Sequence, residues 1–230
     1  MNQEVRLFGA IAVRPAILAV IPTFETATGL TVALKWEVNP TVKKQIEAGE
    51  AFDLVIINPP MIQDLTATGK VRAGSQVAFG RIGMGVAAKA GSRPLDIGSV
   101  EAFVDTLKSA GSIAYASDGT SGGYFSGLLD RLGIADEVKP KLVAIPGGQT
   151  ASAVGRGEAE LGVVPVTSIL AAAPEVMLVG RFPAELQSYI DFAIGISADS
   201  TNAEAARQLS KFLTSTAVDN ILATKGVERR

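Results

Sequence analysis

Short apolar runs alternate with longer amphipathic segments along almost the whole chain. The run 53–58 (DLVIIN) is centred on an unbroken apolar stretch, which is typical of a strand buried on both faces. The predicted strands are residues 4–10, 31–36, 53–58, 112–116, 141–146, 160–166 and 176–182. The predicted helices are residues 15–29, 41–49, 60–69, 99–111, 122–133, 150–157 and 202–226, the last broken near Ser215. Strands that alternate with helices predict an α/β fold with mainly parallel sheets.

Two residues set the expected course of the first helix. Pro22 predicts a kink or an early stop, because proline lacks the N–H that an interior position needs. Gly29 is a suitable residue just beyond the helix end. The first helix should therefore finish near Gly29 or break before it.

One pattern occurs twice in the chain. Residues 45–59 and residues 153–166 each contain a helix end, then Gly-Glu-Ala, then an apolar strand that stops at a proline. The repeat predicts two similar α/β lobes that face each other. Chance similarity between units of a single α/β domain is the alternative.

The composition is informative mainly because it excludes several classes of protein and of functional site. The chain has 230 residues, of which 47% are hydrophobic, and a formal net charge of -2, so a sizeable core is expected and a nucleic-acid partner is not. It contains no Cys and no His, which excludes disulfides, thiolate or imidazole metal sites and Ser-His-Asp catalysis. We expect no cofactor and no metal, and any proton transfer would need Glu, Asp, Lys or Tyr.

The first twenty residues leave the compartment open. Arg14 and Pro15 interrupt the apolar run, and no basic segment precedes it, so we predict neither a signal peptide nor membrane insertion here. The protein is periplasmic if a signal peptide was removed before Met1, and cytoplasmic if Met1 is the native start.

Hydroxyls and glycines crowd between the predicted strand 112–116 and the helix after it. Ser117, Thr120 and Ser121 offer hydroxyl donors, and Gly122 lets a backbone approach a ligand closely. A helix N-terminus combines free N–H groups with the positive end of the helix dipole, so this loop suits an anion. The alternative is that one hydroxyl only caps the helix and the glycines only make the turn.

Four segments of the chain resemble the type II periplasmic substrate-binding proteins. They are VRLFGAIAV (5–13), KKQIEAGEAFDLVI (43–56), TSGGYFSGLLDRLGI (120–134) and GRGEAELGVV (155–164). Within that superfamily they are most similar to the molybdate-binding proteins of ABC importers, a group that includes aconitate isomerase-like members. The resemblance extends over nearly the whole chain.

The resemblance implies an architecture of two α/β lobes joined by two crossing segments, near residues 80–91 and 189–197. Lobe one would comprise residues 1–81 and 196–230, and lobe two residues 82–195. The ligand would lie in a cleft between the lobes, where strands end and helices begin.

The resemblance also implies which residues contact the ligand. Ala12 occupies the position of a serine in the molybdate-binding proteins, and Pro165 that of a tyrosine, so two hydroxyls for an oxyanion are lost. The implied ligand residues are Ile11, Ala12, Arg14, Asn39, Thr41 and Asn58 in lobe one, and Ser117, Thr120, Ser121, Gly122, Gly147, Gly148 and Pro165 in lobe two.

Arg14 shifts the expected ligand towards organic acids. A guanidinium can bind a carboxylate with two parallel hydrogen bonds, whereas neutral hydroxyls and N–H groups suit molybdate. We therefore expect a small di- or tricarboxylate. The alternative is a solvated arginine at a helix start, where its charge opposes the dipole.

Three functional hypotheses follow from these residues and the resemblance. The favoured one is a monomeric solute-binding protein that closes around a small anion and delivers it to an ABC permease, without chemistry. The second is an isomerase that moves a double bond in a tricarboxylate by proton transfer, without metal or nucleotide. Arg14 would hold a carboxylate, and Glu37 or Tyr124 would be the base. A ligand-sensing domain ranks last, since the chain shows no effector region.

Overall fold

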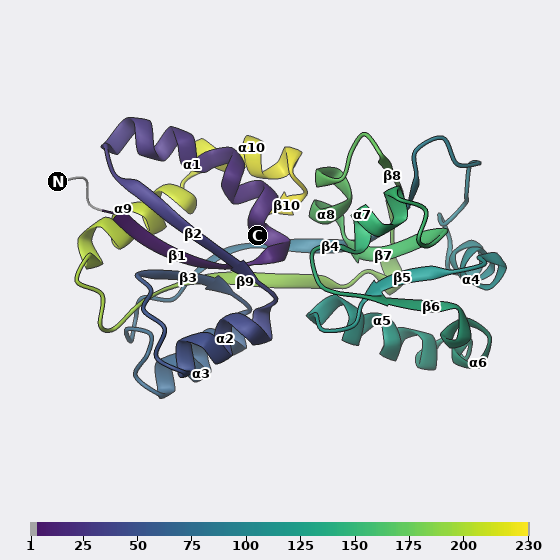
Figure 1. Cartoon of the computed structure of the whole chain (residues 1–230), viewed down its shortest axis with the longest axis horizontal. Coiled ribbons are helices and arrows are strands. Elements are labelled where there is room, and N and C mark those ends of the chain that lie inside the picture. The colour runs from purple at the N-terminus through teal and green to yellow at the C-terminus, as the bar shows by residue number, and fades with distance from the viewer. Residues whose placement is uncertain (1–3, 230) are drawn as a thin grey trace. The chain divides into compact units, whose positions relative to one another are not determined.

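The apolar runs form strands and the amphipathic segments form helices in the computed structural model, which describes residues 4–229. Contacts divide the chain into two compact units. Unit 1 consists of Met1–Arg81 and Asp191–Arg230, and unit 2 consists of Ile82–Ile190. Each unit is an α/β structure built on its own part of one ten-stranded sheet, and that part is called the sheet of the unit below. The predicted fold class is confirmed (Figure 1).

The sheet of unit 1 has three neighbouring parallel strands. The order is β2-β1-β3-β9, with β1 parallel to β2 and β3, and β9 antiparallel to β3. All residues of β3 are buried, as the unbroken apolar run predicts. The bounds are β1 Glu4–Ala10, β2 Thr31–Glu37, β3 Leu54–Ile57 and β9 Tyr189–Ile196.

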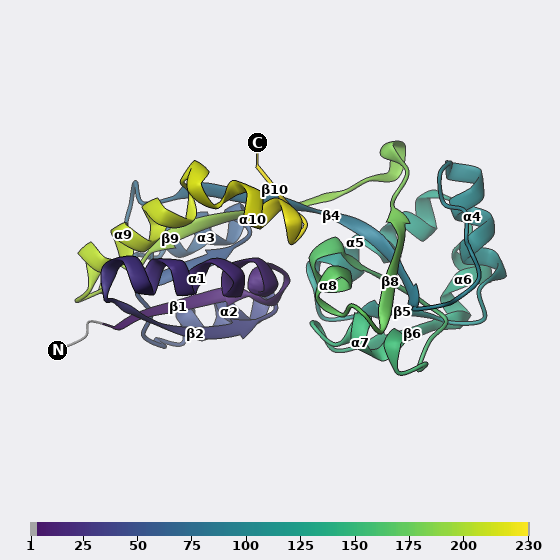
Figure 2. The ribbon, with the colours of Figure 1, turned by 90° about the horizontal axis from the view of Figure 1, so that it is seen from above.

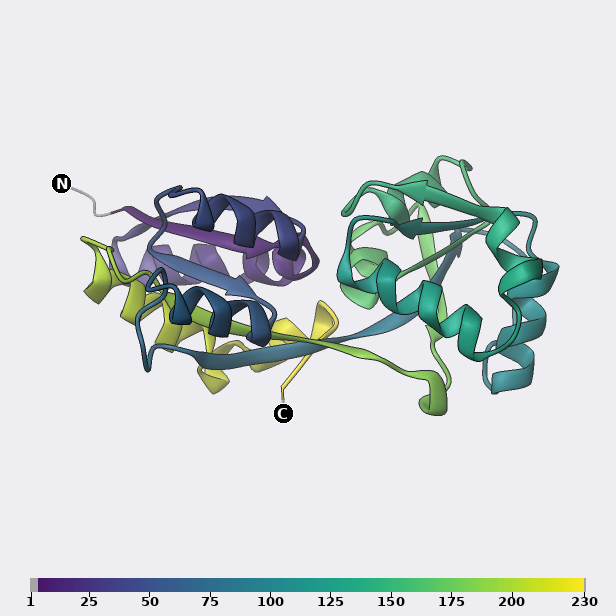
Figure 3. The ribbon, with the colours of Figure 1, turned by 90° about the horizontal axis from the view of Figure 1, so that it is seen from below.

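Helices cover both faces of this sheet. The views from above and below agree that α1, α9 and α10 lie on one face and that α2 and α3 lie on the other (Figures 2 and 3). Their bounds are α1 Arg14–Thr28, α2 Asn39–Glu47, α3 Pro59–Ala67, α9 Ala203–Leu213 and α10 Asp219–Thr224, with short 3-10 turns at Ile11–Val13 and Thr216–Val218.

Helix α1 ends as predicted but does not stop early. Gly29 follows it in the left-handed conformation, with φ of 70°. The helix continues through Pro22, so an early stop is wrong. Ile17, Val20 and Phe24 are buried along one side of it, and this apolar burial offsets the hydrogen bond that Pro22 removes.

The same apolar character gives Ile11–Thr28 the length and hydropathy of a membrane-crossing helix. The segment has a mean hydropathy of 1.2, and 33% of it is buried inside the protein. In the structure this helix packs against α9, α10 and β2. Its apolar residues therefore contribute to the core of unit 1.

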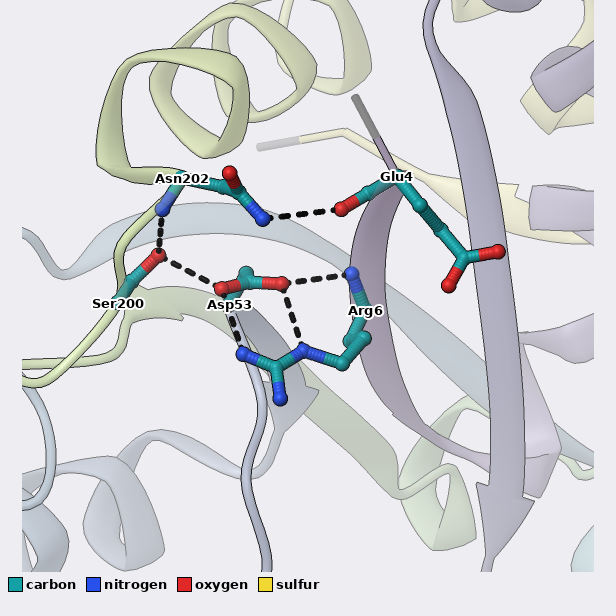
Figure 4. A network of polar contacts seen from close by, with 5 residues as sticks. All are labelled: Glu4, Arg6, Asp53, Ser200 and Asn202. Atoms are coloured by element: carbon teal, nitrogen blue, oxygen red, sulfur yellow. Dashed lines mark hydrogen bonds and ion pairs between the residues drawn. The ribbon is translucent and has the colours of Figure 1, made fainter. Parts of the chain in front are cut away.

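A buried carboxylate joins the two sequence segments that make unit 1 (Figure 4). Asp53 is fully buried and accepts hydrogen bonds from the backbone N–H of Arg6 (2.9 Å), from its Nε (3.0 Å) and from its Nη2 (3.1 Å). The hydroxyl of Ser200 donates to the same carboxylate at 2.7 Å. Asn202 extends the network, because its N–H donates to Ser200 Oγ and its amide to the carbonyl of Glu4.

The sheet of unit 2 combines a parallel centre with antiparallel pairing at β4. The order is β4-β7-β5-β6, β5 is parallel to β6 and β7, and β4 is antiparallel to β7 and β8. Both β4 and β9 run from one unit into the other, so two crossing strands are present, as expected near 80–91 and 189–197. The bounds are β4 Val77–Lys89, β5 Ile113–Ala116, β6 Leu142–Ile145, β7 Leu161–Pro165 and β8 Val176–Arg181.

The helices of unit 2 again cover both faces of the sheet. Helices α5 and α6 lie on one face, and α7 and α8 lie on the other (Figure 1). Besides the 3-10 turns, three short elements were not predicted: α6, α8 and the strand β10 (Val227–Glu228), which pairs with β4. The bounds are α4 Val100–Ser109, α5 Thr120–Arg131, α6 Ala135–Val138, α7 Thr150–Gly155 and α8 Val166–Ala171, with 3-10 turns at Lys139–Lys141 and Ala184–Leu186.

Gly122 is required by the packing of α5 against β5. A Cβ built on it would lie 1.8 Å from the carbonyl oxygen of Ala116, the last residue of β5. Gly123, the next residue, has open space around it. The close approach of strand and helix therefore explains Gly122 and leaves Gly123 unexplained.

Asp53→Asn should lower the free energy of unfolding at neutral pH by about 3 kcal/mol, because it breaks a buried ion pair. This value is at the lower end of the range for such pairs, since the Arg6 side chain is 37% exposed. Burial raises the pKa of Asp53, but hydrogen bonds from Arg6 and Ser200 outweigh it and hold the pKa below its ordinary value. The unfolded chain thus binds this proton at higher pH than the folded chain. The stabilisation is complete above about pH 4 and is lost as the pH falls through the folded pKa.

Urea unfolding of wild type and variant, from neutral pH down to about pH 3, measures this difference, which should narrow at the acidic end. Asp64→Asn is the matched control. Its carboxylate pairs with Lys43 at 2.8 Å but is 60% exposed, so its loss should leave stability almost unchanged. A wild-type advantage over Asp53→Asn that does not vary with pH would contradict the role given to the carboxylate.

Gly122→Ala should lower the free energy of unfolding by about 1–3 kcal/mol, because the new methyl group overlaps the Ala116 carbonyl. Gly123→Ala, in the same helix turn, should raise it by about 0.5–1 kcal/mol through helix propensity. Thermal and urea unfolding of both variants provide the comparison. Equal effects at the two positions would refute the packing explanation.

Candidate functional site

The three parallel strands of unit 1 end together at one edge of the sheet. Ala10 is the register partner of Glu37, and Gly9 pairs with both Trp36 and Ile56. A helix or 3-10 turn begins within two residues of each strand end. The structure therefore brings the predicted unit 1 ligand residues to this edge, namely Ile11, Ala12, Arg14, Asn39, Thr41 and Asn58.

The helices that begin at this edge favour an anion. Within the described residues, α1, α2 and α3 have no side-chain cap and no acidic residue in the first turn. Each has proline in one of its first two positions, where the missing N–H costs nothing. The positive ends of three helix dipoles thus meet at one edge, and none of the three helices carries an acidic residue in its first turn.

Asn39 and Asn58 are tied to each other at this edge. Asn39 is 6% exposed, and its Oδ1 accepts the N–H of Asn58 at 3.2 Å. The Asn58 amide in turn donates to the carbonyl of Asp191 at 2.8 Å. These bonds fix the β2–α2 and β3–α3 connections relative to each other and to the returning strand β9.

Arg14 and Glu37 are the charged residues of the predicted set in unit 1. Arg14 is exposed at the first position of α1, and its guanidinium has no hydrogen bond or ion pair with any residue of the described part of the chain. Glu37 is half-buried at the end of β2, opposite Ala10. The guanidinium is therefore available to a ligand, next to a strand end that carries a carboxylate.

The parallel strands of unit 2 also end together. Ala116 of β5 pairs with Ile145 of β6, and Tyr115 pairs with Val163 of β7. Residues 117–122, residues 146–150 and Pro165 consequently lie at one edge of the sheet of unit 2. This edge contains all the predicted unit 2 ligand residues: Ser117, Thr120, Ser121, Gly122, Gly147, Gly148 and Pro165.

Asp118 joins two of these connections. Its Oδ1 accepts the N–H of Gly147 at 2.8 Å, while the N–H of Ser117 donates to the carbonyl of Ile145. The backbone donor expected at Gly147 is thus already used within unit 2. Gly148 follows with φ of 82°, which only glycine adopts readily, so this residue is explained by the turn.

Ser121 is the most enclosed of the predicted hydroxyls. It is 5% exposed, and its hydroxyl has no hydrogen-bond partner in the described part of the chain. A Cβ on Gly119, the N-cap of α5, would lie 3.8 Å from Ser121 Oγ, so this oxygen lies at the helix start. The N-cap of α5 is Gly119, which has no side chain, so none of the loop hydroxyls belongs to the N-cap residue of this helix.

Tyr124 has a structural partner. Its hydroxyl donates to the carbonyl of Leu186 at 2.7 Å, and the guanidinium of Arg131 lies 5.2 Å from the centre of its ring. The phenol therefore holds the turn at 184–186 against α5. Of the residues suggested for proton transfer, Glu37 is the one without such a bond among the described residues.

Two buried threonines at the unit 2 edge were missed by the sequence analysis. Thr150 is 1% exposed at the start of α7, and Thr167 is 0% exposed at the start of α8. The only signal was their position, directly after a predicted strand that ends at the same edge. In residues 4–229 no group of three or more acidic side chains lies close enough to hold a metal ion.

Comparison with known proteins identifies relatives of this arrangement. A family model described as bacterial extracellular solute-binding protein matches residues 5–228. An aconitate isomerase from a Pseudomonas species is 32% identical over 205 residues, which cover 86% of this chain and 78% of the relative.

Solved structures show the same fold. The periplasmic molybdate-binding protein of Azotobacter vinelandii has a TM-score of 0.83 at 18% identity, covering 98% of this chain and 99% of that one. PEB3 from Campylobacter jejuni, solved with L-phospholactate, has a TM-score of 0.75 at 13% identity, covering 98% and 100%. The match over residues 5–228 shows that this chain belongs to the bacterial extracellular solute-binding proteins.

Proposed function

We propose that the protein binds a small organic di- or tricarboxylate and delivers it to an ABC-type importer. The observation that carries the proposal is Arg14, an exposed guanidinium without a protein partner at the edge where α1, α2 and α3 begin. A carboxylate offers two oxygens in the geometry of a guanidinium fork. A monomer with no metal or cofactor suffices for this role.

One relative supports an organic acid as the ligand. Aconitate is a tricarboxylate, and the isomerase named for it is 32% identical to this chain. The fold alone does not select the ligand, since it also occurs in a molybdate-binding protein and in PEB3 with bound L-phospholactate. Selection must therefore come from side chains such as Arg14, Ala12 and Pro165.

Each unit offers groups of its own that suit an anion. Unit 1 supplies the Arg14 guanidinium and the positive ends of α1, α2 and α3. Unit 2 supplies the unpartnered hydroxyl of Ser121 at the start of α5. Hinge closure is a common response of two-unit binding proteins to a ligand.

The compartment and the partner are part of the same proposal. The family description places its members outside the bacterial cytoplasm, so we propose the periplasm for this protein. An ABC permease would then receive the ligand, which the protein would deliver chemically unchanged.

Arg14→Ala should weaken the binding of citrate or aconitate by about tenfold or more, because a hydrogen bond to a charged group is lost. Isothermal titration with citrate, cis-aconitate, trans-aconitate and molybdate measures the affinities directly. The fluorescence of Trp36, the single tryptophan, gives a second readout, because its ring packs on Gly9 next to the same strand ends.

Arg207→Ala is the matched control for this experiment. Arg207 lies on α9 and pairs with Glu204 at 2.7 Å, so its removal should leave the affinity for every acid unchanged. Tight binding of molybdate with no binding of the carboxylates would overturn the proposed ligand class.

Isomerisation is the second candidate function, favoured by the identity to an aconitate isomerase. In this reaction a base removes a proton from the carbon next to a carboxylate, the double bond shifts by one position, and a proton returns to the far carbon. Atoms and electrons balance without an oxidant. Glu37 is the candidate base because it lies opposite Ala10 at the edge that carries Arg14.

If the protein isomerises, a carbon-bound proton of cis- or trans-aconitate should exchange with deuterated water in its presence. Glu37→Gln should then abolish the exchange while binding measured by titration stays largely intact. Proton NMR of the acids, with and without enzyme, is the measurement. Exchange no faster than in buffer would exclude this second function and leave binding alone.

A further inference from the structure

We infer that Thr150 donates a hydrogen bond to the bound anion and is a specificity-determining residue of unit 2. The inference rests on the proposed function, because it assumes that the anion binds at the edge where β5 and β6 end. It adds a residue that neither the sequence pattern nor the family resemblance indicates.

The first argument is the cost of the buried hydroxyl. Thr150 is 1% exposed, and its Oγ1 is buried without a hydrogen-bond partner in residues 4–229. A hydroxyl removed from water without a partner destabilises a protein. Thr106, another buried threonine of unit 2, shows the usual solution, because its Oγ1 donates to the carbonyl of Asp96 at 2.7 Å.

The second argument is the position of Thr150. It follows the β6–α7 connection, three residues after Gly147. Gly147 is bonded through its N–H to Asp118 of the β5–α5 connection, so the two connections form one structure. Thr150 and Ser121 are therefore buried, unpartnered hydroxyls that follow neighbouring strands at the same edge.

The third argument is chemical complementarity. A carboxylate presents two acceptor oxygens, and a hydroxyl is a neutral donor that adds no charge to a buried position. Ser121 and Thr150 provide one donor each. Together the two donors match the two oxygens of one carboxylate of an organic acid.

The test compares Thr150→Val, which keeps the shape and removes the hydroxyl, with Thr150→Ser, which keeps the hydroxyl. Titration of each variant with citrate and with trans-aconitate should show that Val weakens binding by about tenfold or more and that Ser stays within a few-fold of wild type. Without ligand, Thr150→Val should melt at the same temperature as wild type or higher, because it removes an unsatisfied group.

Thr106→Val is the matched control with the opposite pattern. It should lower the melting temperature by about 2–4 °C, because a buried hydrogen bond is lost, and leave the affinities unchanged. An unchanged affinity in Thr150→Val, a melting temperature lowered as in Thr106→Val, or an equal loss of affinity in Thr150→Ser would overturn the role of Thr150. If wild type binds neither acid, the proposed function itself fails, and this inference fails with it.

Discussion

The buried carboxylate of Asp53 is the constraint on which unit 1 depends. Its two oxygens accept four hydrogen bonds from Arg6 and Ser200, its N–H donates to the carbonyl of Arg6, and its carbonyl accepts the N–H of Ser197. One residue thus connects the first strand, the third strand and the segment that returns after β9. A buried charge tolerates no missing partner, so these segments can combine in only one register.

That register determines which residues lie together at the carboxyl ends of the strands. The network is at the amino ends of β1 and β3, and it aligns these strands so that their carboxyl ends coincide. The helices that follow must then begin at a common edge, which carries Arg14 and Asn39. In unit 2 the hydrogen bond from the Gly147 N–H to Asp118 joins the connections that follow β5 and β6, at the edge where these strands end. The polar groups of these two networks are thus satisfied within each unit, whereas the side chains of Arg14, Ser121 and Thr150 have no partner in residues 4–229.

Much of the fold could be predicted because it depends on local patterns. The apolar run at β3, the glycine that ends α1 and the break near Ser215 are all visible in the sequence. Helix α8 was missed because its first residues, Val166 and Thr167, are β-branched and continue the strand pattern. The state of each polar group at the two edges could not be predicted. Whether Tyr124 bonds a backbone carbonyl and whether Thr150 bonds nothing depend on residues that are distant in sequence and meet only in the folded chain.

The discontinuity of unit 1 has a consequence for how the protein is made. A ribosome releases residues 4–81 first, and these include the apolar strands β1 and β3 and Phe24 of α1. The partners of β3 and Phe24, namely β9 and Phe212, follow only after the whole of unit 2 has been synthesised. Unit 2 is continuous and can fold as it emerges, whereas the first segment must keep an unpaired strand edge from aggregating until the last forty residues arrive. Slow translation through residues 82–190 would prolong that exposure, so chaperone capacity bears most heavily on residues 4–81.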